Sequence, residues 1–277
     1  MLEKKKIGIM QGRLSKPRGK LIQSFPTKTW KKEFIAAKKL SINLIEWTLD
    51  FKNLHQNPLL TERGIKDINL LSKKHNVKIK TITGDCFMQK PFWKQKNKKI
   101  MLSLISDLKK ILTSASRLKV KYLTIPLVDR GSIKNKSQEN FLIKELLKLK
   151  NFLKTKKINI LFETDLPPKE SYLFIKKFNC KSFGINYDIG NSASMNFNPV
   201  NEFKYYGKYI KNVHIKDRKK YGNTVKLGNG NANFSLIFKL LKKIRYNGYL
   251  ILQTARSESG NELKNISNNI KFLDQYI

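Results

Sequence analysis

The run NILFE at residues 159–163 decides the fold of this chain, because it is a short apolar, strand-like segment that ends on a carboxylate. Three further apolar runs also end on a polar side chain: FGINYD at 183–188, IKNVH at 210–214 and YLILQ at 249–253. Each run follows the last by about one strand and one helix, which is the spacing of a βα repeat. In a parallel barrel the carboxyl ends of all strands open onto one face, so these four polar ends are expected to converge.

Short β-type runs alternate with longer amphipathic stretches along the whole chain, which favours an α/β fold with a parallel sheet. The predicted strands cover residues 7–11, 43–47, 78–83, 122–126, 158–163, 182–188, 210–215 and 249–253. The predicted helices cover residues 28–40, 60–75, 98–118, 138–156, 168–178, 199–206, 235–246 and 258–276. Eight strands, each followed by a helix, predict a single (β/α)8 TIM barrel domain over residues 1–277. A doubly wound open sheet is disfavoured because no Gly-x-Gly-x-x-Gly follows the first strand.

The composition sets the broad class of protein. The chain has 277 residues, 40% of them hydrophobic, and contains no apolar stretch of the roughly 18 residues that a membrane helix needs. Its basic start, MLEKKK, leads into the first strand rather than into the long apolar segment of a signal peptide. Cys86 and Cys180 lie far apart in the sequence and form no metal-binding or redox motif. We therefore expect a cytoplasmic protein without a membrane partner.

The net charge of +37 invites a nucleic-acid partner, but the type of basic residue argues against one. Only 8 of the 57 basic residues are Arg, the residue that contacts base edges and phosphates with two hydrogen bonds. Most Lys residues fall on presumed outer helix faces, as in residues 144–157, which indicates a compositional bias toward Lys, Asn and Ile. The charge is better interpreted as favouring small anionic substrates such as sugar phosphates.

Polar side chains follow all eight predicted strands, at the rim where barrels carry their catalytic groups. They include Gln11 to Arg13, Glu46, Asp85, Asp129, Glu163 to Asp165, Asp188, Asn191, His214 to Arg218, Gln253 and Arg256. For any one of them a helix cap or a solvated loop charge is the simpler interpretation, and we favour it for Asp129 and Asp165. Two carboxylates, an imidazole and an amide at successive strand ends can together hold a divalent cation. The four expected metal ligands are therefore Glu163, Asp188, His214 and Gln253.

Two loop features near the last strands leave alternatives open. Asp217 either accepts the second N–H of the His214 ring or caps the loop that follows. The Gly-rich segment LGNGNANF at residues 227–234 precedes a helix, where the N–H groups of Gly228 and Gly230 can hold a phosphate. A mobile loop that needs positive φ explains the same glycines equally well. Candidates for further contacts to such an anion are Arg13 and Arg256.

With these motifs the chain resembles the xylose isomerase-like barrel superfamily, the group of sugar phosphate isomerases and epimerases and endonuclease IV. The resemblance covers essentially the whole chain and is most specific in GIMQGRL (8–14), FET (162–164), YDIGN (187–191), VHIKDR (213–218), LGNG (227–230) and QTAR (253–256). In ketose 3-epimerases and related isomerases of this family, Glu, Asp, His and Glu from strands 5 to 8 hold one divalent metal ion. The resemblance implies that Glu163, Asp188 and His214 fill three of these positions, and that Glu163 is also the catalytic base.

Two residues depart from the family pattern. Gln253 stands where the family has its strand-8 Glu, and Asn191 stands where epimerases usually have a His. An amide oxygen can coordinate a cation, but it cannot abstract a proton at neutral pH. Inverting a carbon normally needs two acid/base groups, whereas aldose–ketose isomerisation can use one base on a single face. The change therefore favours an isomerase over an epimerase, unless Lys216, Glu46 or Asp85 supplies the second group.

The sequence thus predicts a metal-dependent sugar or sugar-phosphate isomerase or epimerase that works through an enediolate, with one Mn²⁺, Mg²⁺, Co²⁺ or Zn²⁺ ion. The expected catalytic residues are Glu163, Lys216 and Arg256. The expected substrate-binding residues are Arg13, Glu46, Asp85, Asn191, Gly228 and Gly230. A catalytically silent carbohydrate-binding barrel is the alternative that Gln253 supports. An endonuclease IV-like nuclease is disfavoured, because three histidines are too few for a trinuclear zinc cluster, and homo-oligomerisation is left open.

Overall fold

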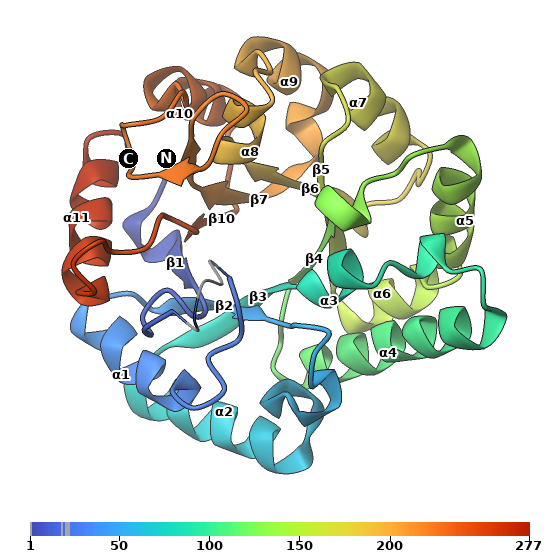
Figure 1. The fold of residues 1–277 in the computed structure, drawn as a ribbon, viewed down its shortest axis with the longest axis horizontal. Coiled ribbons are helices and arrows are strands. Elements are labelled where there is room, and N and C mark those ends of the chain that lie inside the picture. The colour runs from blue at the N-terminus through green and yellow to red at the C-terminus, as the bar shows by residue number, and fades with distance from the viewer. Residues whose placement is uncertain (1, 18, 20–22) are drawn as a thin grey trace.

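The computed structural model describes residues 2–17, 19 and 23–277, and within them eight parallel strands close into a barrel (Figure 1). In order around the barrel the strands are β1 (Ile7–Met10), β10 (Tyr249–Leu252), β7 (Ile210–Ile215), β6 (Phe183–Asp188), β5 (Asn159–Thr164), β4 (Tyr122–Leu127), β3 (Lys78–Thr83) and β2 (Leu44–Thr48). Each predicted strand is present to within one or two residues at its ends. The prediction of a TIM barrel is confirmed.

A ring of helices surrounds the barrel (Figure 1). They are α1 (Trp30–Lys39), α2 (Glu62–His75), α3 (Asp85–Gln89), α4 (Lys98–Arg117), α5 (Lys136–Leu147), α6 (Lys150–Lys156), α7 (Pro168–Lys176), α8 (Ile189–Ser194), α9 (Pro199–Tyr206), α10 (Phe234–Lys243) and α11 (Glu262–Asp274). The helix predicted over residues 138–156 is divided into α5 and α6. The sequence did not predict α3, α8 or the short hairpin of β8 (Asp217–Arg218) and β9 (Thr224–Val225).

The helices pack on the barrel through one apolar face each, as their 3.6-residue period requires. In α4 the buried apolar residues are Leu104, Leu108, Ile111, Leu112 and Ala115, whereas the lysines Lys98, Lys99, Lys109 and Lys110 are exposed. In this helix the lysines therefore do occupy the outer face, as the compositional interpretation expects. None of the helices in the described part of the chain is long and apolar enough to cross a membrane.

The strand register brings the carboxyl ends of the later strands to the same level. In the pairing of β6 with β7, Asp188 lies opposite His214, and in the pairing of β4 with β5, Pro126 lies opposite Glu163. At this level the interior of the barrel is polar rather than apolar. Its side chains there are at most 2% exposed and include Glu46, Thr81, Thr83, Asn186, Asn212 and His214. Buried polar groups need partners, and most of the polar atoms of these side chains hydrogen-bond to one another.

Candidate metal centre

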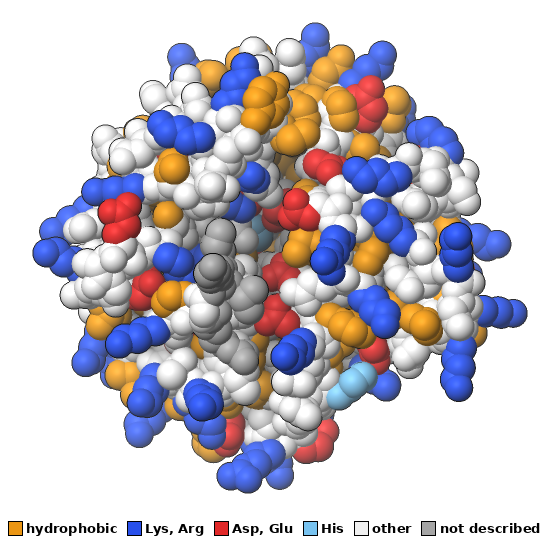
Figure 2. Space-filling model, in the orientation of Figure 1, with side chains coloured by type: hydrophobic (Ala, Val, Ile, Leu, Met, Phe, Trp, Pro, Cys, Tyr) orange, Lys and Arg blue, Asp and Glu red, His pale blue; other side chains and the backbone are white. Residues whose placement is uncertain are grey.

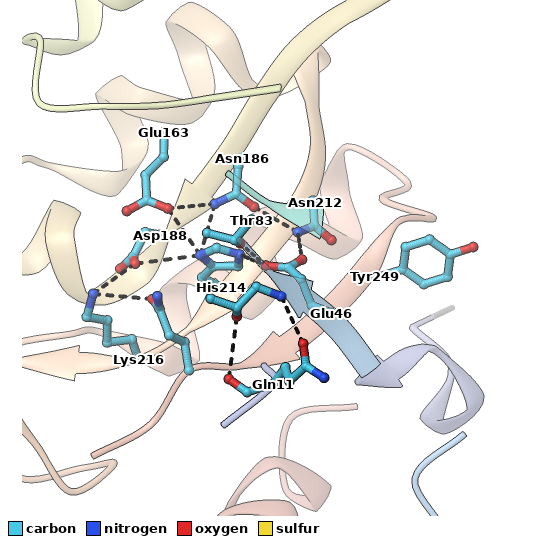
Figure 3. Close-up of polar contacts among 12 residues, drawn as sticks. Gln11, Glu46, Thr83, Glu163, Asn186, Asp188, Asn212, His214, Lys216 and Tyr249 are labelled. Atoms are coloured by element: carbon cyan, nitrogen blue, oxygen red, sulfur yellow. Dashed lines mark hydrogen bonds and ion pairs between the residues drawn. The ribbon is translucent and has the colours of Figure 1, made fainter. Parts of the chain in front are cut away.

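Three of the four expected ligands converge at the carboxyl ends of neighbouring strands (Figure 3). Glu163 on β5, Asp188 on β6 and His214 on β7 each direct one ligand atom to a common point, and these atoms lie within 4.8 Å of one another. Nδ1 of His214 is 3.1 Å from Oε2 of Glu163 and 3.9 Å from Oδ2 of Asp188. All three side chains are buried. The convergence expected from the sequence is therefore present in the fold.

Glu46 on β2 fixes the orientation of the His214 ring. Its Oε1 lies 2.7 Å from Nε2 of His214, and it also accepts a hydrogen bond from the Thr83 hydroxyl. Its Oε2 accepts from the amide of Asn212 at 3.1 Å. This leaves Nδ1 as the ring atom that faces Glu163, and an outer carboxylate of this kind is a common partner of a metal-bound histidine. Glu46 is fully buried, which does not support the expectation that it contacts substrate.

The same geometry determines the protonation of this pair. Burial lowers the pKa of His214, but the carboxylates of Glu46 and Glu163 outweigh it and raise the pKa to about 10. Burial likewise raises the pKa of Glu46, but the His214 ring and the hydrogen bonds it receives lower it below its ordinary value. Both shifts favour the charged form of each group, an imidazolium next to a carboxylate. A metal ion at Nδ1 would take the place of the proton that faces Glu163.

Two asparagines that the sequence analysis did not identify complete the floor of the site (Figure 3). Asn186 on β6 donates to Oε2 of Glu163 at 2.9 Å, and Asn212 on β7 donates to Oδ1 of Asn186 at 2.8 Å. Each asparagine precedes a ligand by two residues, so it shares the inward face of its strand with Asp188 or His214. That spacing was the available signal.

Asn191, at the start of α8, forms hydrogen bonds with both carboxylate ligands, Glu163 and Asp188. Its side-chain amide donates to Oε1 of Glu163 at 2.6 Å, while its Oδ1 accepts from Lys216 at 3.1 Å and from Arg218 at 2.9 Å. The backbone N–H of Asn191 also donates to Oδ1 of Asp188, which caps α8. Both carboxylates that face the centre are thus held by hydrogen bonds in one orientation. Arg218 was not among the expected substrate-binding residues.

Lys216 and Gln253 lie side by side at the edge of the centre. Nζ of Lys216 donates to Oδ2 of Asp188 at 3.2 Å and to Oε1 of Gln253 at 3.3 Å. The Lys216 side chain passes over Gly190, where a Cβ would come within 2.6 Å of Lys216 Cγ, so glycine is required there. The amide oxygen expected to bind a metal ion is thus engaged by an ammonium group.

The N–H groups of the Gly-rich loop bind the side chain of Asp217. Oδ2 of Asp217 accepts hydrogen bonds from the N–H groups of Gly228 at 2.9 Å and Gly230 at 2.8 Å, and Oδ1 accepts from Ala232 N at 3.1 Å. Of the two alternatives for Asp217, the structure therefore shows the loop cap, since Glu46 holds the second nitrogen of His214. The structure does not support the expectation that Gly228 and Gly230 hold a phosphate, because their N–H groups already donate to the Asp217 carboxylate.

The remaining expected residues lie outside the cavity at the centre. Arg256 donates from Nη1 to the carbonyl oxygens of Gly12 and Ser15, so it holds the loop after β1. Arg13 is 2% exposed, and burial, followed by the neighbouring Arg256, lowers its pKa to about 9. Asp85 is buried at the start of α3, and that burial raises its pKa well above the ordinary value. These positions do not support the expected substrate contacts of Arg13 and Asp85 or the catalytic role of Arg256.

A cavity of about 320 Å³ opens at the centre, and two of the three ligands, Glu163 and Asp188, line it. Of the predicted residues, those that line it are Glu163, Asp188, Asn191, Lys216 and Gln253. Arg218, Asp129 and Asp165 line it as well. Figure 2 looks onto the barrel, and acidic side chains gather around its central hollow while Lys and Arg surround them. This volume lies at the lower end of the range of about 300–1,000 Å³ that is typical of pockets for small molecules.

The donor set fits a divalent cation. Two carboxylates and one imidazole nitrogen are ligands that Mg²⁺, Mn²⁺, Co²⁺ and Zn²⁺ accept, and three protein ligands leave positions open for water or substrate. The His214 ring is oriented by Glu46 and the Glu163 carboxylate by Asn186 and Asn191, so the site needs little rearrangement to bind an ion. Within the described residues this is the one cluster of three such ligands.

Comparison with known proteins gives fold and family. Over 98% of its length the chain superimposes on 99% of the IolI protein, whose structure holds a zinc atom, with a TM-score of 0.76 and 16% identity. It also superimposes on the D-allulose 3-epimerase of Methylomonas sp. over 98% of both chains, with a TM-score of 0.77 and 15% identity. These identities show a common fold only.

In sequence, the uncharacterized protein MJ1311 of Methanocaldococcus jannaschii is 31% identical over 91 residues. That alignment covers 32% of this chain and 31% of MJ1311, so it spans about a third of either protein. The profile of the xylose isomerase-like TIM barrel, by contrast, matches residues 34–276, which is most of the chain. The chain therefore belongs to the xylose isomerase-like TIM-barrel family.

Proposed function

We propose that this protein is a metal-dependent isomerase or epimerase of a sugar or sugar phosphate. The observation that carries the proposal is the cluster of Glu163, Asp188 and His214 beneath a cavity of sugar size. A bound divalent ion would polarise a carbonyl and the neighbouring hydroxyl of the substrate and acidify the C–H between them. The D-allulose 3-epimerase that shares this fold acts on a sugar, which supports the substrate class.

Glu163 is the proposed base. Both of its oxygens accept hydrogen bonds from asparagine amides, which hold the carboxylate toward the cavity. It would remove the proton next to the carbonyl and return it to the adjacent carbon of the enediolate. Lys216, whose ammonium group lines the same cavity, would stabilise the negative oxygen that develops.

The contact between Gln253 and Lys216 supports isomerisation over epimerisation. Gln253 cannot exchange a proton, and it accepts a hydrogen bond from Lys216. Asp188 also contacts Lys216. Of the two clustered carboxylates in the described part of the chain, Glu163 is thus the one without a lysine contact. A single base can move a proton between neighbouring carbons on one face of an enediolate. Inversion of the carbon would need a second group to deliver a proton to the opposite face of the enediolate. Lys216, which donates to Gln253, is the candidate for that group, and the experiment below distinguishes the two reactions.

The proposal is tested by deuterium exchange. Protein loaded with Mn²⁺ is incubated in D₂O with aldose and ketose sugars and their phosphates, and exchange at the carbon next to the carbonyl is followed by NMR. Exchange with aldose–ketose conversion is the expected result, and exchange with inversion would identify an epimerase. Binding of a sugar without exchange would instead establish a silent carbohydrate-binding barrel, the alternative that Gln253 favours.

We also propose that the protein works in the cytoplasm. Cys86 and Cys180 are both free thiols, which agrees with a reducing cytoplasm. A nuclease role is disfavoured by the site itself, because His214 is the one histidine in the ligand cluster of the described residues.

A further inference from the structure

Two cations meet at one neutral oxygen on the wall of the cavity. Nζ of Lys216 and Nη1 of Arg218 donate to the same Oδ1 of Asn191, at 3.1 and 2.9 Å. The carboxylate that contacts this pair, among the residues the structure describes, is Asp188, at 3.2 Å from Lys216. Both cations line the cavity above the metal ligands. The pair is therefore balanced by a single negative charge.

Metal binding would remove that balance. In the proposed function Asp188 is a ligand, so its charge would be shared with a divalent ion and would compensate Lys216 less. Gln253, which also accepts from Lys216, is neutral. Two like charges that meet at an amide oxygen, beside a divalent ion, create a strongly positive wall. An anionic group on the ligand is the partner that such a wall favours.

Arg218 is held in place for this role. Its Nε and Nη2 both donate to the carbonyl oxygen of Gly222, at 3.0 and 2.8 Å, in the turn between β8 and β9. One edge of the guanidinium is thus clamped by the hairpin, and the opposite nitrogen, Nη1, is turned toward Asn191. A preorganised guanidinium loses little side-chain entropy when it binds a carboxylate or phosphate. With 57 basic residues but only 8 arginines in the chain, an arginine at this position is not explained by composition.

The cavity also carries negative charge, on the loops that follow β4 and β5 rather than β7. Asp129 and Asp165 follow β4 and β5 and line the same cavity as Lys216 and Arg218. Carboxylates accept hydrogen bonds from the hydroxyl groups of a sugar but repel an anion. The cavity is therefore polarised, and a ligand with one anionic end and several hydroxyls would bind in one direction.

We infer that the ligand of this site is an anionic sugar, and that Arg218, next to the positive charge of Lys216, binds its carboxylate or phosphate. The inference rests on the proposed function, because it takes Asp188 as a metal ligand. It assigns Arg218 to substrate binding and explains the neutral Gln253, since a carboxylate there would pair with Lys216 and compete with the anion of the ligand.

The test uses three ligands that differ at one carbon. D-Fructose, D-fructuronate and D-fructose 6-phosphate share carbons 1 to 5 and carry a hydroxyl, a carboxylate or a phosphate at carbon 6. Their dissociation constants are measured by calorimetry on Mn²⁺-loaded protein. The variant is Arg218→Gln, and Arg130→Gln is the matched control, because Arg130 is an exposed arginine that follows β4. Arg218→Lys, which keeps the positive charge, is the second variant. It separates loss of charge from unfolding of the hairpin, in case Arg218→Gln unfolds because its hydrogen bonds to Gly222 are lost.

At least one anionic ligand should bind roughly tenfold or more tightly than D-fructose, because a hydrogen bond to a charged group is worth more than a neutral one. Arg218→Gln should remove most of that preference, while Arg218→Lys and Arg130→Gln should retain it. The anion that binds more tightly identifies carboxylate or phosphate as the group recognised.

Equal affinities for the three ligands, absence of binding by both anions, or an equal loss in the Arg130→Gln control would overturn the inference. The last result would attribute the preference to the net charge of the whole protein. Failure of the proposed function is recognised separately, because it would appear as absence of Mn²⁺ binding or of deuterium exchange in any sugar.

Discussion

Glu46 offers the sharpest test of the centre, because His214 is the one proposed metal ligand that it contacts among the described residues. The proposed change is Glu46→Gln, which keeps the size of the side chain and removes its charge. Gln can still accept from Nε2 of His214 with its carbonyl oxygen. Its NH₂ group would then occupy the position of Oε2 and face the amide of Asn212, which now donates to that oxygen at 3.1 Å. Two donors would be opposed inside the barrel.

The expected loss of metal affinity follows from this geometry. Outer partners of metal-bound histidines typically contribute 10- to 100-fold to affinity. The upper end is expected here, because Glu46 is fully buried and lies 2.7 Å from the ring. A loss of about 100-fold corresponds to about 2.7 kcal/mol. The two opposed donors should also lower the free energy of unfolding of the metal-free protein by about 1–3 kcal/mol.

The measurement is the dissociation constant of Mn²⁺, obtained by titration with electron paramagnetic resonance detection of the free ion. Glu202→Gln is the matched control, because Glu202 is also a buried carboxylate at 1% exposure. Its oxygens accept from the hydroxyls of Tyr187, Ser192 and Tyr206 rather than from a metal ligand. A loss of less than threefold in Glu46→Gln, or an equal loss in the control, would refute the assignment of Glu46 as the partner that orients His214.

Three further predictions concern the base, the strand-8 position and a buried glutamate. Glu163→Gln should slow deuterium exchange by roughly 10²- to 10⁴-fold, and a loss below tenfold would exclude Glu163 as the base. Gln253→Glu should change the dissociation constant of Mn²⁺ by less than about threefold, measured by calorimetry, because the new carboxylate would pair with Lys216; tightening of about tenfold or more would instead place residue 253 in the metal shell. Burial raises the pKa of Glu33 from 4.5 to about 7. The folded protein therefore holds this proton more tightly than the unfolded chain, and the free energy of unfolding should fall by ~3 kcal/mol as pH rises from 4.5 to 7. Urea titrations should show this fall in the wild type relative to Glu33→Gln, and parallel pH profiles would contradict it.

The barrel and its ligands were predictable because each depends on a local pattern. Apolar runs that end on Glu163, Asp188 and His214 give both the strand and the position of the ligand at its carboxyl end. Asn186 and Asn212 were predictable in the same way, since a polar residue two positions before a ligand must share its face. They were missed because an asparagine inside a strand carries no chemistry by itself.

The contacts made by loops were not predictable, because they join segments that are distant in sequence. Whether the N–H group of Gly228 can bind a ligand depends on the orientation of the Asp217 side chain. The periodicity of apolar residues in the sequence does not predict that orientation. Arg256 illustrates the same limit: it follows the last strand, as a phosphate ligand would, yet it holds the loop after β1. Polarity at the rim of a barrel therefore indicates candidates, and only packing separates ligand contacts from loop supports.

The two departures from the family pattern have a common explanation in space. Asn191 and Gln253 are far apart in sequence, but the ammonium group of Lys216 donates to both of their side-chain oxygens. A glutamate at 253 would pair with Lys216 and neutralise it, whereas two amides hold the group in position and leave its charge. With Asn191 and Gln253 at these positions, the site carries the positive charge of Lys216 next to β10, where the family pattern has a carboxylate. A double change of Asn191→His and Gln253→Glu should therefore restore the family pattern and weaken binding of anionic sugars relative to D-fructose, whereas retained anion preference would show that Arg218 alone supplies it.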